Sequence, residues 1–516
     1  MGVGLIVGFS TDPLDLSGAR ILVAGAGTTG AAVVRAVTGL GASAVVVDRR
    51  FAGAESDAEH APERYLTGAG AFSGVDLVVT SPGFSPTNPF LLAAQAAGIG
   101  VWGDVELAWR LDRAGLTGAP RTWLVITGTN GKTTTTAMTE SILRAAGISA
   151  LACGNIGLTV LDALSAEPRA EVLAVELSSF QLHWAPSVRP RAGVVLNIAD
   201  DHLDWHGSFE AYRDAKAQVL LGDVAVVGLD DPVAGALATP AGSRRVGFTL
   251  AAPGPGQLGR QHGMLVDAAF DDAGGSRPIT RAPAELLPAD RVRPAGPSGM
   301  ADALAAAALT RAIGVSTAAV ARGLATFSPA AHRGQVVARI GEVDFIDDSK
   351  ATNPHAAQAA IVGHDRVVLI AGGLLKGAPV DDLVRTCAGR LTGVVAIGRD
   401  RQVIVDAIAR HAPQVPVVTV FTGDDGGVTL QRIAGPDVTA LADAALAAGR
   451  PDLSDADAVM AQAVGQAWAL AQDAPDTRAV LLAPAAASLD MFASYGARGD
   501  SFAAAATRLA GAVAER

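Results

Sequence analysis

The sequence has few cysteines and no excess of basic residues. Cys153 and Cys387 are its two cysteines, which excludes a disulfide scaffold and gives no four-ligand zinc site. The 40 Lys and Arg residues are outnumbered by 51 Asp and Glu, which leaves a formal net charge of −11 at pH 7. This balance argues against a nucleic-acid binder that relies on a basic face. A polyanion would have to be held by local cations and backbone N–H groups.

Long hydrophobic runs are also absent from the sequence. No stretch has about 18 uncharged apolar residues, so we expect no transmembrane helix and no membrane partner. The first basic residue is Arg20, and the N-terminal segment is therefore a poor match to a secretory signal. Together with the cysteine usage, these absences predict a cytoplasmic protein in a reducing compartment.

The composition that is present supports a large folded core. A chain of 516 residues, at about 100–200 residues per domain, should contain about three domains. Hydrophobic residues make up 50% of the chain and charged residues 18%, which excludes intrinsic disorder as the main state.

Short apolar runs alternate with alanine-rich helical stretches along the whole chain. Such alternation, with runs that end at Gly, Asp or Ser, is typical of α/β folds with doubly wound parallel sheets. Two stretches rich in Gly, Pro and Asp, 251–297 and 422–457, lack the pattern. We expect the first to be an irregular, exposed end of a middle domain and the second a surface insertion. The expected strands are 21–24, 45–47, 77–80, 123–126, 172–176, 194–197, 367–371, 394–397 and 479–483.

The chemically informative motifs fall into three groups along the chain. One group lies before about residue 103, one between about 122 and 220, and one after about 332. We therefore predict three domains, with the ranges 1–102, 103–329 and 330–516.

The first group contains a glycine loop, Gly25-Ala-Gly-Thr-Thr-Gly30, between an expected strand and a helical stretch. Asp48 ends the next expected strand, about 20 residues on, which is the spacing of a dinucleotide fingerprint. The glycines let the backbone approach a phosphate at a helix N-terminus, and the carboxylate can accept hydrogen bonds from a ribose or a base. The loop by itself fits NAD, another nucleotide or a purely structural turn.

A second glycine loop in the middle group is the most specific segment of the chain. An expected strand runs into Gly128-Thr-Asn-Gly-Lys-Thr-Thr134. Backbone N–H groups and Lys132 suit the β- and γ-phosphates of a nucleotide, and the Thr133 hydroxyl suits Mg²⁺. The loop departs from the strict P-loop form because Ile126 stands where the first glycine would be.

Other residues of the middle group offer partners for phosphate or metal. Glu176 ends an expected strand, where it could be a Mg²⁺ ligand or an ordinary solvated carboxylate. His202 follows another strand and could bind a second metal ion, although a lone histidine is more often structural. Asn155 lies in a further glycine turn and could donate to a phosphate. By composition alone, Lys216 would be a solvated helix lysine.

The third group places polar clusters at the carboxyl ends of expected strands, where open α/β sheets bind ligands. Arg333, Lys350, Lys376 and Arg498 can neutralise phosphates or carboxylates, while Ser488 and Thr352 can hydrogen-bond to them. Each cluster alone could be surface charge, but several strand-end clusters together indicate a binding site.

Seven segments occur in the order in which one enzyme family carries them. They are G-T-N-G-K-T-T, E-L-S-S-F-Q-L, N-I-A-D-D-H-L-D, Y-R-D-A-K, D-D-S-K-A-T-N-P, G-G-L-L-K-G and A-P-A-A-A-S-L-D-M-F. On these segments the chain resembles the Mur peptide ligases over essentially its whole length, and most closely the members that add D-glutamate. The resemblance implies a Rossmann-like N-terminal domain that binds a UDP-linked substrate rather than NAD. It also implies a central P-loop-type ATPase domain with a mainly parallel sheet, and a C-terminal Rossmann-like α/β domain that brings the amino acid.

The resemblance further implies roles for single residues. It assigns to ATP Gly128, Thr129, Asn130, Gly131, Lys132, Thr133, Thr134, Asp302, Arg333 and Asp348. It assigns to the uridine substrate Thr28, Thr29, Asp48, Ser81, Gly83 and Asn155, and to D-glutamate Thr352, Lys376, Ser488, Leu489 and Tyr495. The implied metal ligands are Thr133, Glu176, His202 and Lys216 (as a carbamate), and the implied catalytic residues are Lys132, His202, Lys216 and Lys350.

The activity implied by the resemblance is an ATP-dependent amide ligation. D-glutamate would be joined to UDP-N-acetylmuramoyl-L-alanine through an acyl phosphate, with ATP and two Mg²⁺ ions, by a cytoplasmic monomer in peptidoglycan precursor synthesis. This places the chain in cell-wall biogenesis, cell shape, cell division and the cell cycle. Alternatives are a sister ligase for another amino acid, an NAD-dependent dehydrogenase and a non-catalytic nucleotide-regulated module. The chain departs from the family pattern at Gly299 and Asp302, where asparagines are usual, and at Tyr495, where phenylalanine is common.

Overall fold

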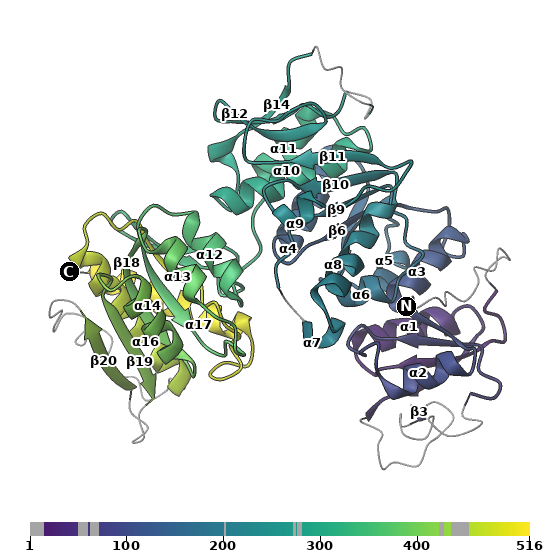
Figure 1. Ribbon diagram of the computed structural model, residues 1–516, viewed down its shortest axis with the longest axis horizontal. Helices are drawn as coiled ribbons and strands as arrows, with labels where there is room; N and C mark the ends of the chain where they lie inside the picture. The colour runs from purple at the N-terminus through teal and green to yellow at the C-terminus, as the bar shows by residue number, and fades with distance from the viewer. Residues whose placement is uncertain are drawn as a thin grey trace. The chain divides into compact units, whose positions relative to one another are not determined.

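The computed structural model describes residues 15–49, 60–61, 72–200, 203–271, 275, 281–422, 428–434 and 454–515 (Figure 1). The chain divides into two compact units. The first unit comprises residues 1–289 and 301–327 and holds two of the three described sheets. The second comprises residues 290–300 and 328–516 and holds the third sheet. The predicted boundaries of three domains stay a prediction.

The first sheet is entirely parallel, with the strand order β3-β2-β1-β4-β5. Its central strands are near-continuous apolar runs buried on both faces, as parallel sheets require. The elements are β1 (Arg20–Ala24), α1 (Thr28–Thr38), β2 (Ser43–Val47), β3 (His60–Ala61), β4 (Leu77–Thr80), α2 (Pro89–Ala96), β5 (Gly100–Gly103) and α3 (Asp104–Arg113).

The second sheet has the order β14-β13-β12-β11-β10-β9-β6-β8-β7, parallel from β7 to β12 and antiparallel beyond. Its first elements are β6 (Thr122–Thr127), α4 (Lys132–Ala145), β7 (Ala150–Gly154), α5 (Val160–Leu164), β8 (Val172–Glu176), α6 (Ser179–His183), β9 (Ala192–Val195), α7 (Leu203–His206) and α8 (Phe209–Ala217). There follow η3 (Gln218–Leu221), β10 (Val224–Gly228), α9 (Pro232–Gly235), β11 (Arg244–Phe248), β12 (Gln257–Gln261), β13 (Met264–Asp267), β14 (Ala284–Pro288), η4 (Ala289–Arg291), α10 (Pro297–Arg311) and α11 (Thr317–Thr326).

The third sheet has the order β15-β16-β21-β17-β18-β19-β20, with a parallel centre and an antiparallel strand at each edge. Apolar side chains fill both of its faces, in two clusters of buried residues. The elements are β15 (Gln335–Ile340), β16 (Val343–Asp347), α12 (Pro354–Val362), β17 (Val367–Gly372), α13 (Asp381–Cys387), β18 (Leu391–Ile397), α14 (Arg401–His411), β19 (Val417–Thr422), β20 (Val428–Ala434), α16 (Asp455–Asp473), β21 (Ala479–Leu482) and α17 (Tyr495–Ala514).

The α/β fold class with mainly parallel sheets is confirmed. The expectation that residues 251–297 are irregular is wrong. These residues contain β12, β13 and β14, which extend the second sheet by antiparallel pairing. His262 and Gly263 join β12 to β13 in a two-residue turn, with φ of 49° and 77°. Positive φ at both residues is the geometry of a tight β-hairpin turn. The flanking strands contain no long apolar run, so the sequence pattern did not indicate them. In the 422–457 stretch, residues 428–434 form β20, while 423–427 and 435–453 lie outside the described residues.

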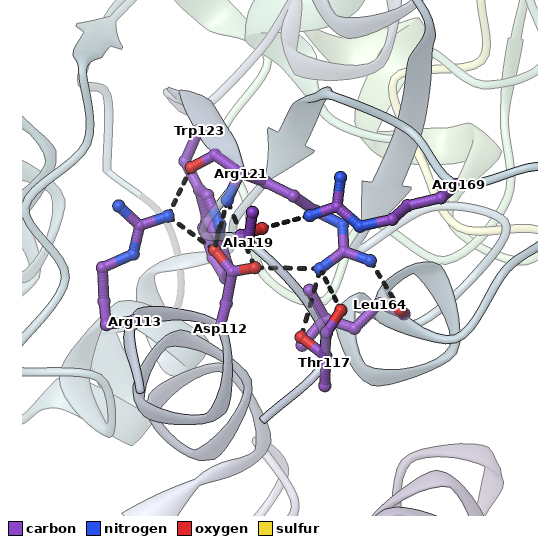
Figure 2. Close-up of polar contacts among 8 residues, drawn as sticks. All are labelled: Asp112, Arg113, Thr117, Ala119, Arg121, Trp123, Leu164 and Arg169. Carbon is purple, nitrogen blue, oxygen red and sulfur yellow. Dashed lines mark hydrogen bonds and ion pairs between the residues drawn. The ribbon is translucent and has the colours of Figure 1, made fainter. Parts of the chain in front are cut away.

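A buried ion pair fixes the connection between the first two sheets. Helix α3 ends shortly before β6, and its Asp112 accepts hydrogen bonds from Arg121 Nη1 at 2.9 Å and from Trp123 Nε1 at 2.9 Å. Figure 2 shows Arg113 and Arg121 reaching this carboxylate from opposite sides. Arg121 also donates to the Leu164 carbonyl at the end of α5. The buried Asp112 carboxylate thus has two counter-charges beside it, which offset the cost of taking it out of water.

Candidate active site

The second glycine loop connects β6 to α4 at the carboxyl edge of the second sheet. Gly131 precedes the helix with φ of 84°, a conformation that favours glycine. Asn197, just beyond β9, holds the loop: its side chain accepts from Asn130 N at 2.8 Å, and its carbonyl accepts from Thr129 N at 3.0 Å. Asn197 is a residue to which our sequence reasoning gave no role, although it lies in one of the quoted motifs. The first N–H groups of α4 lack partners within the helix, so this terminus suits an anion.

Lys132, the first residue of α4, folds back over the loop. Its Nζ donates to the carbonyl oxygens of Gly128 at 3.0 Å and Thr129 at 2.8 Å. The side chain is only half-buried, so a phosphate bound at the loop can replace these carbonyls as the hydrogen-bond acceptor of the ammonium group. Lys132 therefore lies where the sequence predicted a phosphate-binding cation.

Three predicted residues, Thr133 of α4, Asn155 after β7 and Glu176 at the end of β8, meet beside the loop. Glu176, the last residue of β8, is 2% exposed and accepts from Thr133 Oγ1 at 2.7 Å and from Asn155 Nδ2 at 3.0 Å. A Cβ on Gly154 would lie 2.2 Å from the Glu176 carbonyl oxygen, so only glycine allows β7 to approach β8 so closely. A carboxylate and a hydroxyl are hard oxygen donors, and this donor set fits Mg²⁺.

Lys216 is buried, which corrects the composition-based expectation of a solvated helix lysine. It is 2% exposed on α8, and its Nζ donates to the Gly128 carbonyl at 2.8 Å. That carbonyl also accepts from Lys132, so two lysine amines converge on one oxygen of the phosphate loop. Tyr212, which the sequence analysis did not single out, lies under the Lys216 Nζ, and its hydroxyl is 2.9 Å from Thr129 Oγ1. His202 lies outside the described residues.

Asp302 on α10 lies against the loop. Its Oδ1 accepts from Thr135 Oγ1 at 3.1 Å, and a Cβ on Gly131 would lie 2.3 Å from the same oxygen. The carboxylate thus packs beside the start of α4, a contact that the sequence pattern did not indicate. Gly299 precedes it on the same helix, where a Cβ would clash with the Pro294 carbonyl oxygen at 1.9 Å.

The first glycine loop joins β1 to α1 at the carboxyl edge of the first sheet. Gly25 has φ of 106°, and the Ala26 N–H donates to Asp48 Oδ2 at 2.6 Å. Thr28 and Thr29 open α1 and are exposed and half-buried, respectively. Across the loop, Ser81 follows β4, and its buried Oγ has no hydrogen-bond partner in the described part of the chain. Gly83, two residues on, is exposed.

The third group of predicted residues gathers in the second unit. Strand β21 pairs with both β16 and β17, so the loops after these three strands are neighbours. Lys350 Nζ lies 3.9 Å from the centre of the Tyr495 ring. Burial raises the pKa of Asp348 to about 7, although the neighbouring Arg333 opposes this shift. The remaining predicted residues lie on the same loops. Thr352 is half-buried and Ser488 is buried. Lys376 is exposed with φ of 54°, and Leu489 is 66% exposed.

Arg498 has a different place from the one the sequence suggested. It is 1% exposed and donates to the Ser349 hydroxyl at 3.0 Å, the Ser349 carbonyl at 2.9 Å and the Ala486 carbonyl at 3.1 Å. Burial lowers the pKa of this guanidinium to about 10. Arg498 therefore joins the loop after β16 to the loop after β21 through these hydrogen bonds. With these bonds the buried guanidinium holds together two loops that carry predicted site residues.

Comparisons with known proteins agree with this geometry. Residues 126–252 match the Mur ligase middle domain, and residues 19–103 match the Mur ligase MurD-like N-terminal domain. A UDP-N-acetylmuramoylalanine–D-glutamate ligase of Rhodococcus jostii is 56% identical over 503 residues, which are 96% of each chain. The protein of that name from Mycolicibacterium smegmatis is 54% identical over 498 residues, 95% of this chain and 96% of its own. The chain belongs to the Mur ligase family. Members of this family are in general ATP-dependent and require Mg²⁺.

Solved structures share the fold of this Mur ligase. A pseudomurein peptide ligase type C from Methanothermus fervidus has a TM-score of 0.52 at 14% identity, covering 94% of this chain and 99% of its own. MurF from Acinetobacter baumannii has a TM-score of 0.51 at 18% identity, covering 92% and 89%. Within the described residues, no helix is long and apolar enough to cross a membrane.

Proposed function

We propose that this Mur ligase joins D-glutamate to UDP-N-acetylmuramoyl-L-alanine at the expense of ATP, in cytoplasmic peptidoglycan precursor synthesis. The observation that carries the proposal is the whole-length similarity to ligases of that name, at 50–56% identity. The arrangement of Lys132, Thr133 and Glu176 supports this proposal. A phosphate loop beside the hydroxyl and carboxylate oxygens suits a nucleoside triphosphate with its bound metal ion. A monomer is proposed as the active form.

The proposed reaction proceeds in two steps. The carboxylate of the L-alanyl end attacks the γ-phosphorus of ATP, the bond from that phosphorus to the bridging oxygen breaks, and ADP leaves. The amine of D-glutamate then attacks the acyl phosphate, loses a proton, and expels inorganic phosphate to leave the amide. A free carboxylate is a poor electrophile, so the phosphate supplies the leaving group. Positioning and charge stabilisation are the tasks left to the protein.

The first unit provides the phosphate chemistry in this proposal. Lys132 would exchange its two loop carbonyls for the phosphoryl oxygens, and residues Gly128–Thr134 would donate backbone N–H groups. Thr133 and Glu176, with Lys216 if it is carbamylated and with His202 by the resemblance, would hold Mg²⁺. When bound, Mg²⁺ neutralises charge on the β- and γ-phosphates. Arg333 and Asp348, in the second unit, and Asp302 are assigned to the nucleotide.

The two other substrates have separate proposed sites. The uridine nucleotide is assigned to the first glycine loop with Thr28, Thr29 and Asp48, and the unpaired Ser81 hydroxyl gives that site a polar group ready for a ligand. D-glutamate is assigned to the loops of the second unit, where Thr352, Lys376 and Ser488 can bind carboxylates. Leu489 and Tyr495 would cover the amino acid, and Lys350 would face the transferring group.

Phosphate release tests the proposal. Purified protein is incubated with ATP and Mg²⁺, with each of the two other substrates alone and with both together. Release that requires both UDP-N-acetylmuramoyl-L-alanine and D-glutamate is the expected result. Release with L-alanine or a diamino acid in place of D-glutamate would identify a sister ligase instead. Hydride transfer to or from NAD(H), without phosphate release, would contradict the proposal altogether.

A further inference from the structure

Trp184 belongs to the second sheet's part of the chain but is buried in the core of the first sheet. It is 5% exposed. The apolar cluster that contains it has nine other buried residues, all between Leu22 and Ala94. Trp184 directly follows α6, which itself begins shortly after Glu176. The buried Trp184 indole, with the partly buried Trp205 packed against the same cluster, thus links the core of the nucleotide-binding sheet to the part of the chain that carries the candidate metal ligand.

Two hydrogen bonds hold Trp184 in the first sheet. Its Nε1 donates to the Phe84 carbonyl at 3.2 Å, and its own carbonyl accepts from Gly103 N at 2.8 Å. A Cβ on Gly103 would lie 2.8 Å from the Trp184 Cβ, so glycine is needed for this approach. The indole is therefore bonded to the loop after β4, and its backbone to the end of β5.

Both ends of this link are tied to candidate binding residues. On one side, Phe84 N donates to the Ser81 carbonyl, and Ser81 Oγ would lie 2.5 Å from a Cβ on Gly25 of the first glycine loop. On the other side, α6 is capped by Ser178 and Gln181, and Leu177 N donates to the Ile126 carbonyl of β6. Short, hydrogen-bonded segments therefore run from the first glycine loop through Trp184 to Glu176.

We infer that Trp184 is a positioning residue that sets the distance between the uridine-nucleotide site and the phosphate-transfer site. The inference rests on the proposed function, in which one substrate carries its nucleotide at one end and its reacting carboxylate at the other. Such a substrate gains from a fixed spacing, because each end then holds the other near its reaction partner. A variable distance between the two sites lowers kcat, while the affinity of each site for its own nucleotide stays unchanged.

The test compares Trp184→Ala and Trp184→Phe with Trp468→Phe as a control. Trp468 is a partly buried tryptophan of α16 in the second unit, where it packs against Phe345 of the third sheet. Trp184→Ala should lower kcat about 10- to 100-fold, the range expected for a small misplacement of reacting groups. Trp184→Phe removes the N–H donor and part of the ring but keeps an aromatic side chain, and should lower kcat about fivefold. Dissociation constants for UDP and for ADP should stay within about twofold of the parent, because neither site is altered.

A distance measurement separates this inference from the proposed function. Both native cysteines are buried, so spin labels can be placed at Leu92→Cys on α2 and Glu171→Cys before β8, two exposed positions. The distance distribution should be narrow in the parent and in Trp468→Phe, and broader in Trp184→Ala, or in Trp184→Phe should the alanine variant fail to fold. An unchanged distribution, or UDP and ADP affinities that fall in parallel with kcat, would overturn the inference. A parent that releases no phosphate with both substrates would refute the proposed function, while the distances would still decide the role of Trp184.

Discussion

The hydroxyl of Thr133 donates a hydrogen bond of 2.7 Å to Glu176, which lies 43 residues further along the chain. Thr133 opens the helix after the phosphate loop, and Glu176 ends a neighbouring strand. Because β6 and β8 are parallel and adjacent, their carboxyl ends bring these two oxygen donors together. Asn155 donates to the other carboxylate oxygen, so the Glu176 side chain is oriented from two sides.

Glu176→Gln tests whether this pair holds a divalent cation. The amide keeps the shape of the side chain and can still accept from Thr133, but it loses the negative charge that attracts Mg²⁺. We expect the Mg²⁺ concentration for half-maximal phosphate release to rise about tenfold or more. Glu171→Gln, at an exposed position just before the same strand, is the control and should match the parent. An unchanged Mg²⁺ dependence would remove Glu176 from the metal site.

Lys132→Ala tests the phosphate loop. The Nζ donates to carbonyls of its own loop and the side chain is half-buried, so its loss should leave the melting temperature nearly unchanged. Ligation should fall by a factor of about 100 or more, as for the loss of a charge-stabilising donor. Near-normal turnover in a folded Lys132→Ala variant would contradict the ATP assignment.

Lys216→Ala tests the carbamate role. Lys216 is buried beside the phosphate loop, so truncation opens a space that a short carboxylate can enter. Activity should be lost and then partly restored by added formate or acetate, because these supply the missing anionic oxygen. The same salts should not restore Lys132→Ala, which lacks a cation instead. Failure of every short carboxylate to rescue Lys216→Ala would argue for the lysine acting as an amine.

Asp104 makes the stability of the first unit depend on pH. Its buried Oδ1 has no hydrogen-bond partner among the described residues, and burial raises the pKa of this carboxyl from 3.8 to about 7. The folded state therefore holds the proton more tightly, and stability falls as the pH rises from about 4 to about 7, by up to about 1.4 kcal/mol per pH unit. Asp104→Asn should remove this fall, so its melting temperature should gain on the parent with rising pH. Asp214→Asn, at an exposed site, should show a constant difference from pH 5 to pH 8.

Asp112→Ala tests the buried ion pair of Figure 2. Removing the carboxylate leaves the Arg121 guanidinium, 1% exposed, without its counter-charge, and should cost about 3–5 kcal/mol of unfolding free energy. Arg35→Ala breaks an ion pair whose arginine is 61% exposed, and should cost below about 1 kcal/mol. Urea unfolding followed by tryptophan fluorescence reports both changes. Equal costs for the two variants would show that burial does not govern the Asp112 pair.

The fold class, the family and the loops proposed to bear the chemistry can all be recognised from the order of the residues alone. Buried parallel strands are apolar along their whole length, and glycine loops with a lysine have few structural uses, so both can be recognised locally. The short antiparallel strands between Gln257 and Pro288 escaped notice because pairing within the sheet, and not a long apolar run, stabilises them.

Which polar residues stay accessible and which are buried for support depends on contacts between distant segments of the folded chain. Lys216 and Arg498 are both cations in alanine-containing helices, and nothing local distinguishes them from solvated residues. Contacts with residues 88 and 149 positions away bury them, Lys216 against Gly128 and Arg498 against Ser349. Nothing in the sequence around Trp184 distinguishes it from other apolar core residues. It nevertheless packs into the core of the first sheet, although its neighbours in the chain belong to the second. Burial and hydrogen bonding of this kind depend on which distant segments meet, and that is settled only when the chain folds.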